Sequence, residues 1–287
     1  MVLIVFGLLA VLSIGFASVC YVVIDNPELI APPPPLRTAN SPAEYVIGDL
    51  GGMPVKIDHR IVRFIEYDGD PGWGEMRRGP RPQRTYSSRL KSFAFEVRYP
   101  DMKTRADKDA QVDYEKYHPL FSSLRPESRD TNPWFDGGID AGDRYPGHGS
   151  LDRLYQGTIL NPDQQPISAQ LLPEPSLVSG LELYAPRGRN PATGNPWRFE
   201  SSWGDTYIHR NHLGKVTAYI QCAYRLGTRR YSECTHHWNM EQFDLDISVD
   251  IYYPATYLPE WRDIQERVSY FLLSFRSSPD GGKTLAP

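Results

Sequence analysis

The first 24 residues, MVLIVFGLLAVLSIGFASVCYVVI, contain no charged side chain. As a helix, a segment of this length spans about 36 Å, which exceeds the roughly 30 Å thickness of a bilayer's hydrocarbon core. We therefore expect residues 1–24 to form a transmembrane anchor. The remainder of the chain then sits at a membrane surface.

Two alternatives remain for this segment. A cleaved signal peptide normally has a basic start and a shorter apolar core, whereas no Lys or Arg precedes Arg37 here. A lipoprotein signal would place the modified thiol at Cys20, but Val19 occupies a position where a small residue is preferred. An anchor, a cleaved signal and a lipid on Cys20 would all export the rest of the chain.

A Pro-rich linker, residues 25–44, follows the apolar segment. Pro32–Pro35 cannot enter a helix or a central strand and favour an extended spacer. Residues 45–287 are long enough for one large domain, possibly with two sub-domains over 45–120 and 176–287 joined by a loop-rich region. The net charge of -4 argues against nucleic-acid binding.

Period-two alternation of apolar residues predicts an antiparallel sheet. Near the start, residues 45–50 and 55–67 flank Gly51-Gly52 as a hairpin would. Further strands are expected in SFAFEVRYP, LELY, WRFESSW, TYIHR, KVTAYIQCAYR, RRYSECTHHW and LDISVDIYY. In the last of these segments, aspartates alternate with apolar residues. One face of this strand is therefore expected to pack in the core and the other to face solvent.

Helical spacing appears in two places. Residues 103–120 carry many charges and indicate only a short surface helix. The C-terminal segment from Pro259 to Phe275 has apolar residues at intervals of three, four and seven, so it predicts an amphipathic helix lying on the sheet. Residues 122–170 are rich in Pro, Gly, Asp and Ser and indicate a loop region. The expected fold class is α+β.

The cysteines Cys222 and Cys234 lie symmetrically about Thr228. If the flanking strands pair as a hairpin around Thr228, the two thiols face each other directly, which is where cross-strand neighbours come within disulfide range. We expect a disulfide bond, which an oxidising compartment would preserve.

Catalytic and metal-binding patterns are weak in this chain. His209 and His212 would point to different faces of a strand, and the adjacent His236 and His237 share that problem. No GxSxG motif occurs. The pattern predicts no metal site and no cofactor. If the chain has a hydrolytic site, the best candidates for it are His148, Asp143 and Ser150.

Two loops combine acids with tryptophan, YDGDPGW and WFDGGIDAGD. Their acids could bond turn backbone, bind calcium or contact a partner. We take partner contact as the functional hypothesis, because aromatic anchors dominate interface energetics. The predicted contact residues are Asp68, Asp70, Trp73, Trp134, Asp136, Asp140 and Asp143.

Several segments resemble a family of small exported bacterial proteins: VRFIEYDGDPGWGEMRRGPRPQRTYSSRLKSFAFEVRYPDM, YIQC, CTHHW and VDIYYPATYLPEWRDIQERVSYFLLSF. The resemblance covers about Ile47 to Phe275, and its most specific parts are EYDGDP, RYPDM and the LPxWRxIQ helix. The family resembled is the periplasmic immunity proteins of type VI secretion toxin/immunity cassettes. Many of its members are lipoproteins, from which the poor lipobox of this chain departs.

This resemblance implies a binding protein, not an enzyme, which neutralises a secreted toxin of the lipase or peptidase class by occluding its active site. The expected location is the bacterial inner membrane, single-pass, with the main domain in the periplasm, or alternatively a periplasmic lipoprotein attached through Cys20. Two other hypotheses remain open: an envelope adaptor of a secretion machine, and a hydrolase whose site is assembled from distant residues.

Overall fold

The computed structural model describes residues 44–71, 75, 79–80, 82–118, 129–160, 170–200, 204–224 and 231–278. The predicted anchor lies before this part of the chain, as does the predicted linker except for Glu44. Among the described residues, every helix is too short or too polar to span a bilayer.

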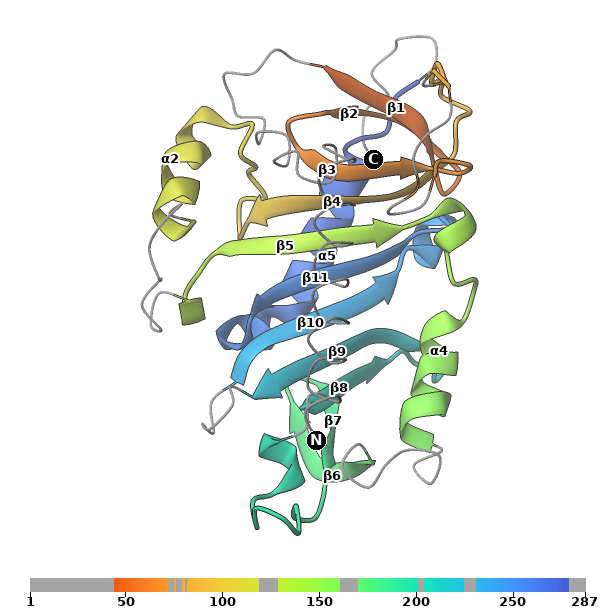
Figure 1. The fold of residues 1–287 in the computed structure, drawn as a ribbon. Coiled ribbons are helices and arrows are strands. Elements are labelled where there is room, and N and C mark those ends of the chain that lie inside the picture. The colour runs from red at the N-terminus through yellow and green to blue at the C-terminus, as the bar shows by residue number, and fades with distance from the viewer. Residues whose placement is uncertain are drawn as a thin grey trace, which may run out of the picture. The chain divides into compact units, whose positions relative to one another are not determined.

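The described strands form a two-stranded sheet and a nine-stranded sheet, and neighbouring strands are antiparallel throughout (Figure 1). The small sheet pairs β1 with β2, and the large sheet has the order β3-β4-β5-β11-β10-β9-β8-β7-β6. The strands are β1 Tyr45–Leu50, β2 Met53–Asp58, β3 Val62–Tyr67, β4 Leu90–Arg98, β5 Trp134–Asp140, β6 Leu171–Val178, β7 Leu181–Pro186, β8 Asp205–Arg210, β9 Val216–Tyr224, β10 Tyr231–Asn239 and β11 Ser248–Pro254.

Helix α5, Trp261–Leu273, crosses one face of the large sheet (Figure 1). Its buried side chains include Trp261, Ile264, Val268 and Leu272, which join the main hydrophobic core. The predicted amphipathic helix and its place on the sheet are therefore confirmed. The fold is a mostly antiparallel sheet with this helix packed on it, as the α+β prediction required.

The described residues cover only part of the face of the large sheet opposite α5, and we call it the open face. Helix α2, Lys108–Tyr117, lies near β4 and β5, where Tyr114 contacts Trp134. Helix α4, Ser150–Tyr155, continues into a π-helical turn, Gln156–Leu160, and shares a second hydrophobic cluster with β7, β8 and β9. Among the described helices, none covers the open face of β5, β11 and β10 between these two.

Short 3-10 helices connect the larger elements. They are η2 Gly142–Arg144, η6 Trp197–Phe199, η7 Glu241–Phe243 and η8 Ala255–Glu260. The sequence prediction of a strand in WRFESSW is therefore wrong over Trp197–Phe199. Residues 201–203 of that segment lie outside the described part.

Two further predictions need correction. The strand expected over residues 55–67 is interrupted, because the Asp58 carboxylate accepts the backbone N–H of Arg60 at 2.9 Å and turns the chain between β2 and β3. The loop region expected over residues 122–170 contains β5, a central strand. Pairing of β5 with β11 joins strands from 45–120 and 176–287 into one sheet.

Candidate functional site

The open face owes its polarity to alternation along three neighbouring strands. In β5, Phe135 and Ile139 are buried in the core, whereas Asp136 and Asp140 point to the opposite side. In β11, Val249 and Ile251 are likewise in the core. The intervening Asp250 and Tyr252, together with Glu233 of β10, therefore face the same way as the β5 acids.

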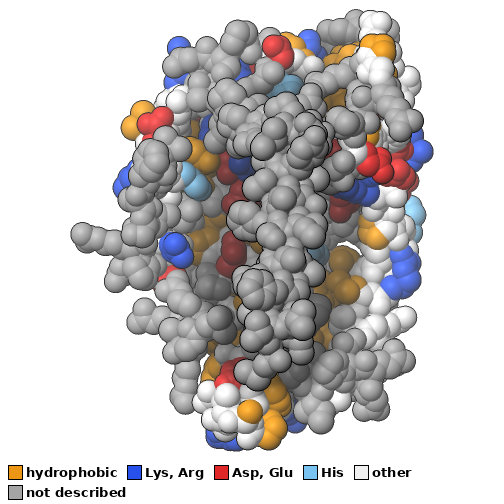
Figure 2. Space-filling model, in the orientation of Figure 1, with side chains coloured by type: hydrophobic (Ala, Val, Ile, Leu, Met, Phe, Trp, Pro, Cys, Tyr) orange, Lys and Arg blue, Asp and Glu red, His pale blue; other side chains and the backbone are white. Residues whose placement is uncertain are grey.

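Strand register places these side chains close together. Tyr252 is paired with Asp136 on one side and with Thr235 on the other, and Asp250 is paired with Gly138 and His237. Tyr252 is 40 % exposed, and the side chain of Asp136 is 58 % exposed. Figure 2 shows acidic side chains over the central strands of this face. We call Asp136, Asp140, Glu233 and Asp250 the open-face acids.

Crowding on the sheet affects how three of these acids ionise. Removal from water raises the pKa of Asp136, and the nearby Glu96 raises it further. The pKa of Asp140 is raised by burial and then by Asp250, and that of Glu233 by burial and then by Asp136. For each of the three acids a neighbouring carboxylate adds to the effect of burial, so these side chains repel one another and a cation approaching this face gains energy.

Arginine side chains pair with the acids at the β4 side of the open face. The buried Glu96 carboxylate lies 3.0 Å from Arg105 Nε and 3.0 Å from Arg63 Nη2. Arg63 Nη2 also lies 3.3 Å from Asp136 Oδ1. Glu233, which pairs with Pro254 at the end of β11, forms no ion pair with any described residue.

The two acidic loops predicted from sequence do meet. The backbone N–H of Asp143 donates to Asp68 Oδ1 at 3.1 Å, and Asp68 also lies 3.2 Å from Arg89. Asp70 pairs with Arg84 and accepts the backbone N–H of Tyr67. Their carboxylates thus bond turn backbone and arginine, the first of the roles that the sequence left open.

The predicted tryptophans are placed differently. Trp134 is 3 % exposed, its Nε1 donates to Asp113 Oδ2 at 3.2 Å, and its ring meets the edge of Tyr114. It therefore holds α2 against the sheet instead of offering an exposed surface. Trp73 lies outside the described residues.

Three contributors to the open face were not in the predicted site: Glu233, Asp250 and Tyr252. A signal for two of them was present, because alternation in LDISVDIYY assigns Asp250 and Tyr252 to the wet side of the strand. The alternation does not predict which strands lie next to β11. That β11 lies between β5 and β10 depends on pairing between distant segments.

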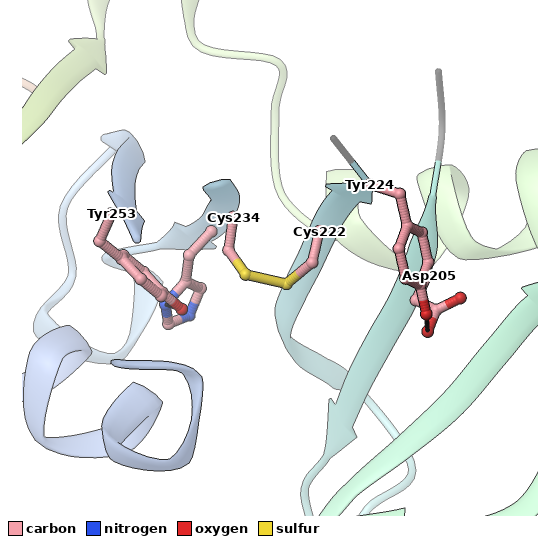
Figure 3. Close-up of a disulfide and its surroundings, with 6 residues drawn as sticks. Asp205, Cys222, Tyr224, Cys234 and Tyr253 are labelled. Atoms are coloured by element: carbon pink, nitrogen blue, oxygen red, sulfur yellow. Dashed lines mark hydrogen bonds between the residues drawn. A yellow bond between two sulfur atoms is a disulfide. The ribbon is translucent and has the colours of Figure 1, made fainter. Parts of the chain in front are cut away.

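The predicted disulfide is confirmed: Cys222 of β9 is bonded to Cys234 of β10, with Cα atoms 4.0 Å apart (Figure 3). Both cysteines are fully buried in the core. Beside them, Tyr224 donates a hydrogen bond at 3.2 Å to the buried Asp205, which also accepts a hydrogen bond from Arg198. The bond joins β9 to β10, one of the three strands that carry the open-face acids.

The hydrolase candidates do not assemble as a nucleophile and its base. His148 lines a hollow of about 480 Å³ with Asp152 and Glu241, among others. Its ring nitrogens lie 3.5 Å from Glu241 and 3.1 Å from Asp246. The Ser150 hydroxyl instead accepts a hydrogen bond from Asn239, and Asp143 lies beside Lys91.

Comparisons with known proteins give little beyond this geometry. No family model matches the sequence, and no curated protein matches it significantly. Among solved structures, the chain is similar to Smlt3025, described as an immunity protein of the Stenotrophomonas maltophilia type IV secretion system. The two are 19 % identical with a TM-score of 0.47, over 84 % of this chain and 98 % of that one. A likeness at this level carries no argument about function.

Proposed function

We propose that the protein is a periplasmic immunity protein, anchored in the inner membrane, that binds and neutralises a secreted toxin by occluding its active site. The observation that supports this most directly is the open face, where the open-face acids and Tyr252 lie on strands β5, β11 and β10. Fixed carboxylates on a rigid sheet favour association with a cationic protein surface.

The finer part of the proposal rests on sequence. Segments such as EYDGDP and RYPDM resemble immunity proteins of type VI secretion cassettes, so the proposed toxin is a type VI effector of the lipase or peptidase class. The uncharged residues 1–24 support membrane anchoring, with a lipid on Cys20 as the alternative. A disulfide between Cys222 and Cys234 fits an oxidising compartment such as the periplasm.

The proposed role is not enzymatic. Support comes from the surroundings of His148, whose two nitrogens face carboxylates, while the Ser150 hydroxyl is engaged by Asn239. General-base activation would require a direct or water-bridged contact between base and nucleophile. A binding protein needs no such contact.

Co-expression tests the proposal. The full chain is expressed in the periplasm together with the secreted effector encoded beside it, and cell survival is measured. We expect the effector to be lethal alone and harmless with this chain, and the two to form a stable 1:1 complex burying at least about 1,000 Å². The proposal fails if the effector stays lethal and does not co-purify.

A catalytically inactive effector serves as the control, because binding should persist without any toxicity to suppress. An envelope adaptor would behave differently. It would co-purify with other envelope proteins. Its presence would not change the survival of cells attacked by sibling cells.

A further inference from the structure

Phe64, in strand β3 at the edge of the large sheet, has an unusual backbone conformation. Its φ is 53°, in the left-handed region that residues with a Cβ atom rarely adopt. The side chain gains little burial in return, because Phe64 is 65 % exposed. Strained residues of this kind persist where surrounding structure enforces them, and they cluster at functional sites.

An irregularity in strand pairing enforces this conformation. The register between β3 and β4 shifts between Arg63 and Glu66, so Phe64 lies within a bulge. On either side, Val62 and Tyr67 are buried in the core. Bulges re-aim side chains in this way, and here the bulge directs a large aromatic ring to the surface.

The ring lies beside a hollow of about 440 Å³ between the two sheets. The hollow is lined by Tyr45 and Ile47 of β1, by Phe64 and Tyr67 of β3, and by Arg84. Tyr45 is 54 % exposed, so two aromatic rings border one concave surface. Exposed aromatics around a hollow are typical of the centre of a protein interface.

Charge connects this aromatic patch to the open face. The Arg63 guanidinium lies 6.0 Å from the centre of the Phe64 ring, and the same group lies 3.3 Å from Asp136. A partner that covers Phe64 therefore also comes close to Asp136, the nearest of the open-face acids. Its matching surface must combine an apolar cleft with basic residues along one border.

We propose that Phe64 is the apolar anchor of the toxin interface, inserted into a cleft of the toxin that is bordered by Lys or Arg. This inference rests on the proposed function and adds the contact centre and the chemistry of the partner surface. The strained backbone presents the ring before binding, so little conformational freedom is lost when the complex forms.

Two substitutions of Phe64 test the inference. Both Phe64→Ala and Phe64→Gly remove the ring, but glycine accepts a positive φ without strain. We expect Phe64→Gly to melt no lower than the wild type and Phe64→Ala to melt below Phe64→Gly. Both should weaken binding of the purified neighbouring effector at least about 30-fold, the scale of a hot spot, measured by titration calorimetry.

Tyr270→Ala is the matched control, because this aromatic side chain is 63 % exposed on α5, away from the proposed interface. It should bind the effector like the wild type. If the wild type binds no effector, the proposed function fails. If the wild type binds and Phe64→Gly binds equally well, the inference alone is overturned. Wild-type self-association that Phe64→Gly abolishes would also overturn it, by identifying a second copy as the occupant.

Discussion

At the scale of single residues, His236 is a buried group whose protonation differs between the folded and unfolded states. It is fully buried in β10, with Nε2 3.2 Å from Gln265 Oε1 and Nδ1 3.4 Å from the Tyr253 hydroxyl. Burial, and then the neighbouring His237, lower its pKa to about 3. The histidine is therefore neutral in the folded protein under conditions where it is charged in the unfolded chain.

The sign of the effect follows from proton uptake. Between about pH 3 and 6.5 the unfolded state binds one more proton at His236 than the folded state, so stability falls as the pH is lowered. We expect His236 to cost about 2 kcal/mol of unfolding free energy between pH 7.5 and 5.0, since each pKa unit corresponds to about 1.4 kcal/mol. Urea unfolding at the two pH values measures it.

The comparison must be with His236→Gln, because the raised pKa values of Asp136, Asp140 and Glu233 act on stability in the opposite direction as the pH is lowered. The wild type should lose more stability on acidification than His236→Gln does. His212→Gln, at an exposed histidine, should behave like the wild type. Equal acid sensitivity of the wild type and His236→Gln would contradict the prediction.

At the scale of elements, the disulfide joins two neighbouring central strands. Cys222 and Cys234 are separated by 12 positions, a short loop for which cross-linking stabilises by about 2 to 3 kcal/mol in the chain-entropy account. We expect reduction, or the Cys222→Ala/Cys234→Ala double substitution, to lower the unfolding free energy by this amount. Denaturant unfolding with and without reductant measures it, and the double variant should not respond to reductant.

How far the elements could be predicted depends on where their determinants lie. Strands β8 to β11 and helix α5 carry their own periodicity and were found, although β11 begins later than the segment assigned to it. Strand β5 was missed because its Gly137-Gly138 pair is typical of a loop. The reason for Gly137 lies in β4: a Cβ atom there would come within 2.3 Å of the Phe95 ring.

The candidate site likewise contains some features that one strand's sequence predicts and others that depend on distant segments. Alternation along one strand assigns Asp136 and Asp140 to one face. In contrast, the contact between Asp143 and Asp68, and the neighbourhood of Glu233 and Asp136, require pairing between segments that are distant in sequence. Exposure of Phe64 depends on a bulge between β3 and β4, for which the sequence contains no glycine or other local signal.

At the scale of the whole molecule, the large sheet separates an apolar face under α5 from the face that carries the open-face acids. Charge on the open face should therefore govern association, and charge elsewhere should not. Glu233→Lys reverses one exposed open-face acid, whereas Glu266→Lys makes the same change on α5. The two variants have the same net charge, so only the position of the change distinguishes them.

We expect Glu233→Lys to slow association with the effector at least about tenfold at low salt, and Glu266→Lys to leave the rate near that of the wild type. The wild-type rate should fall as salt rises, because salt screens the attraction between the open-face acids and a basic partner. Stopped-flow association at several ionic strengths measures both effects. Equal rates for the two variants would place the toxin contact on another surface, because a partner approaching the open face must pass within a Debye length of Glu233.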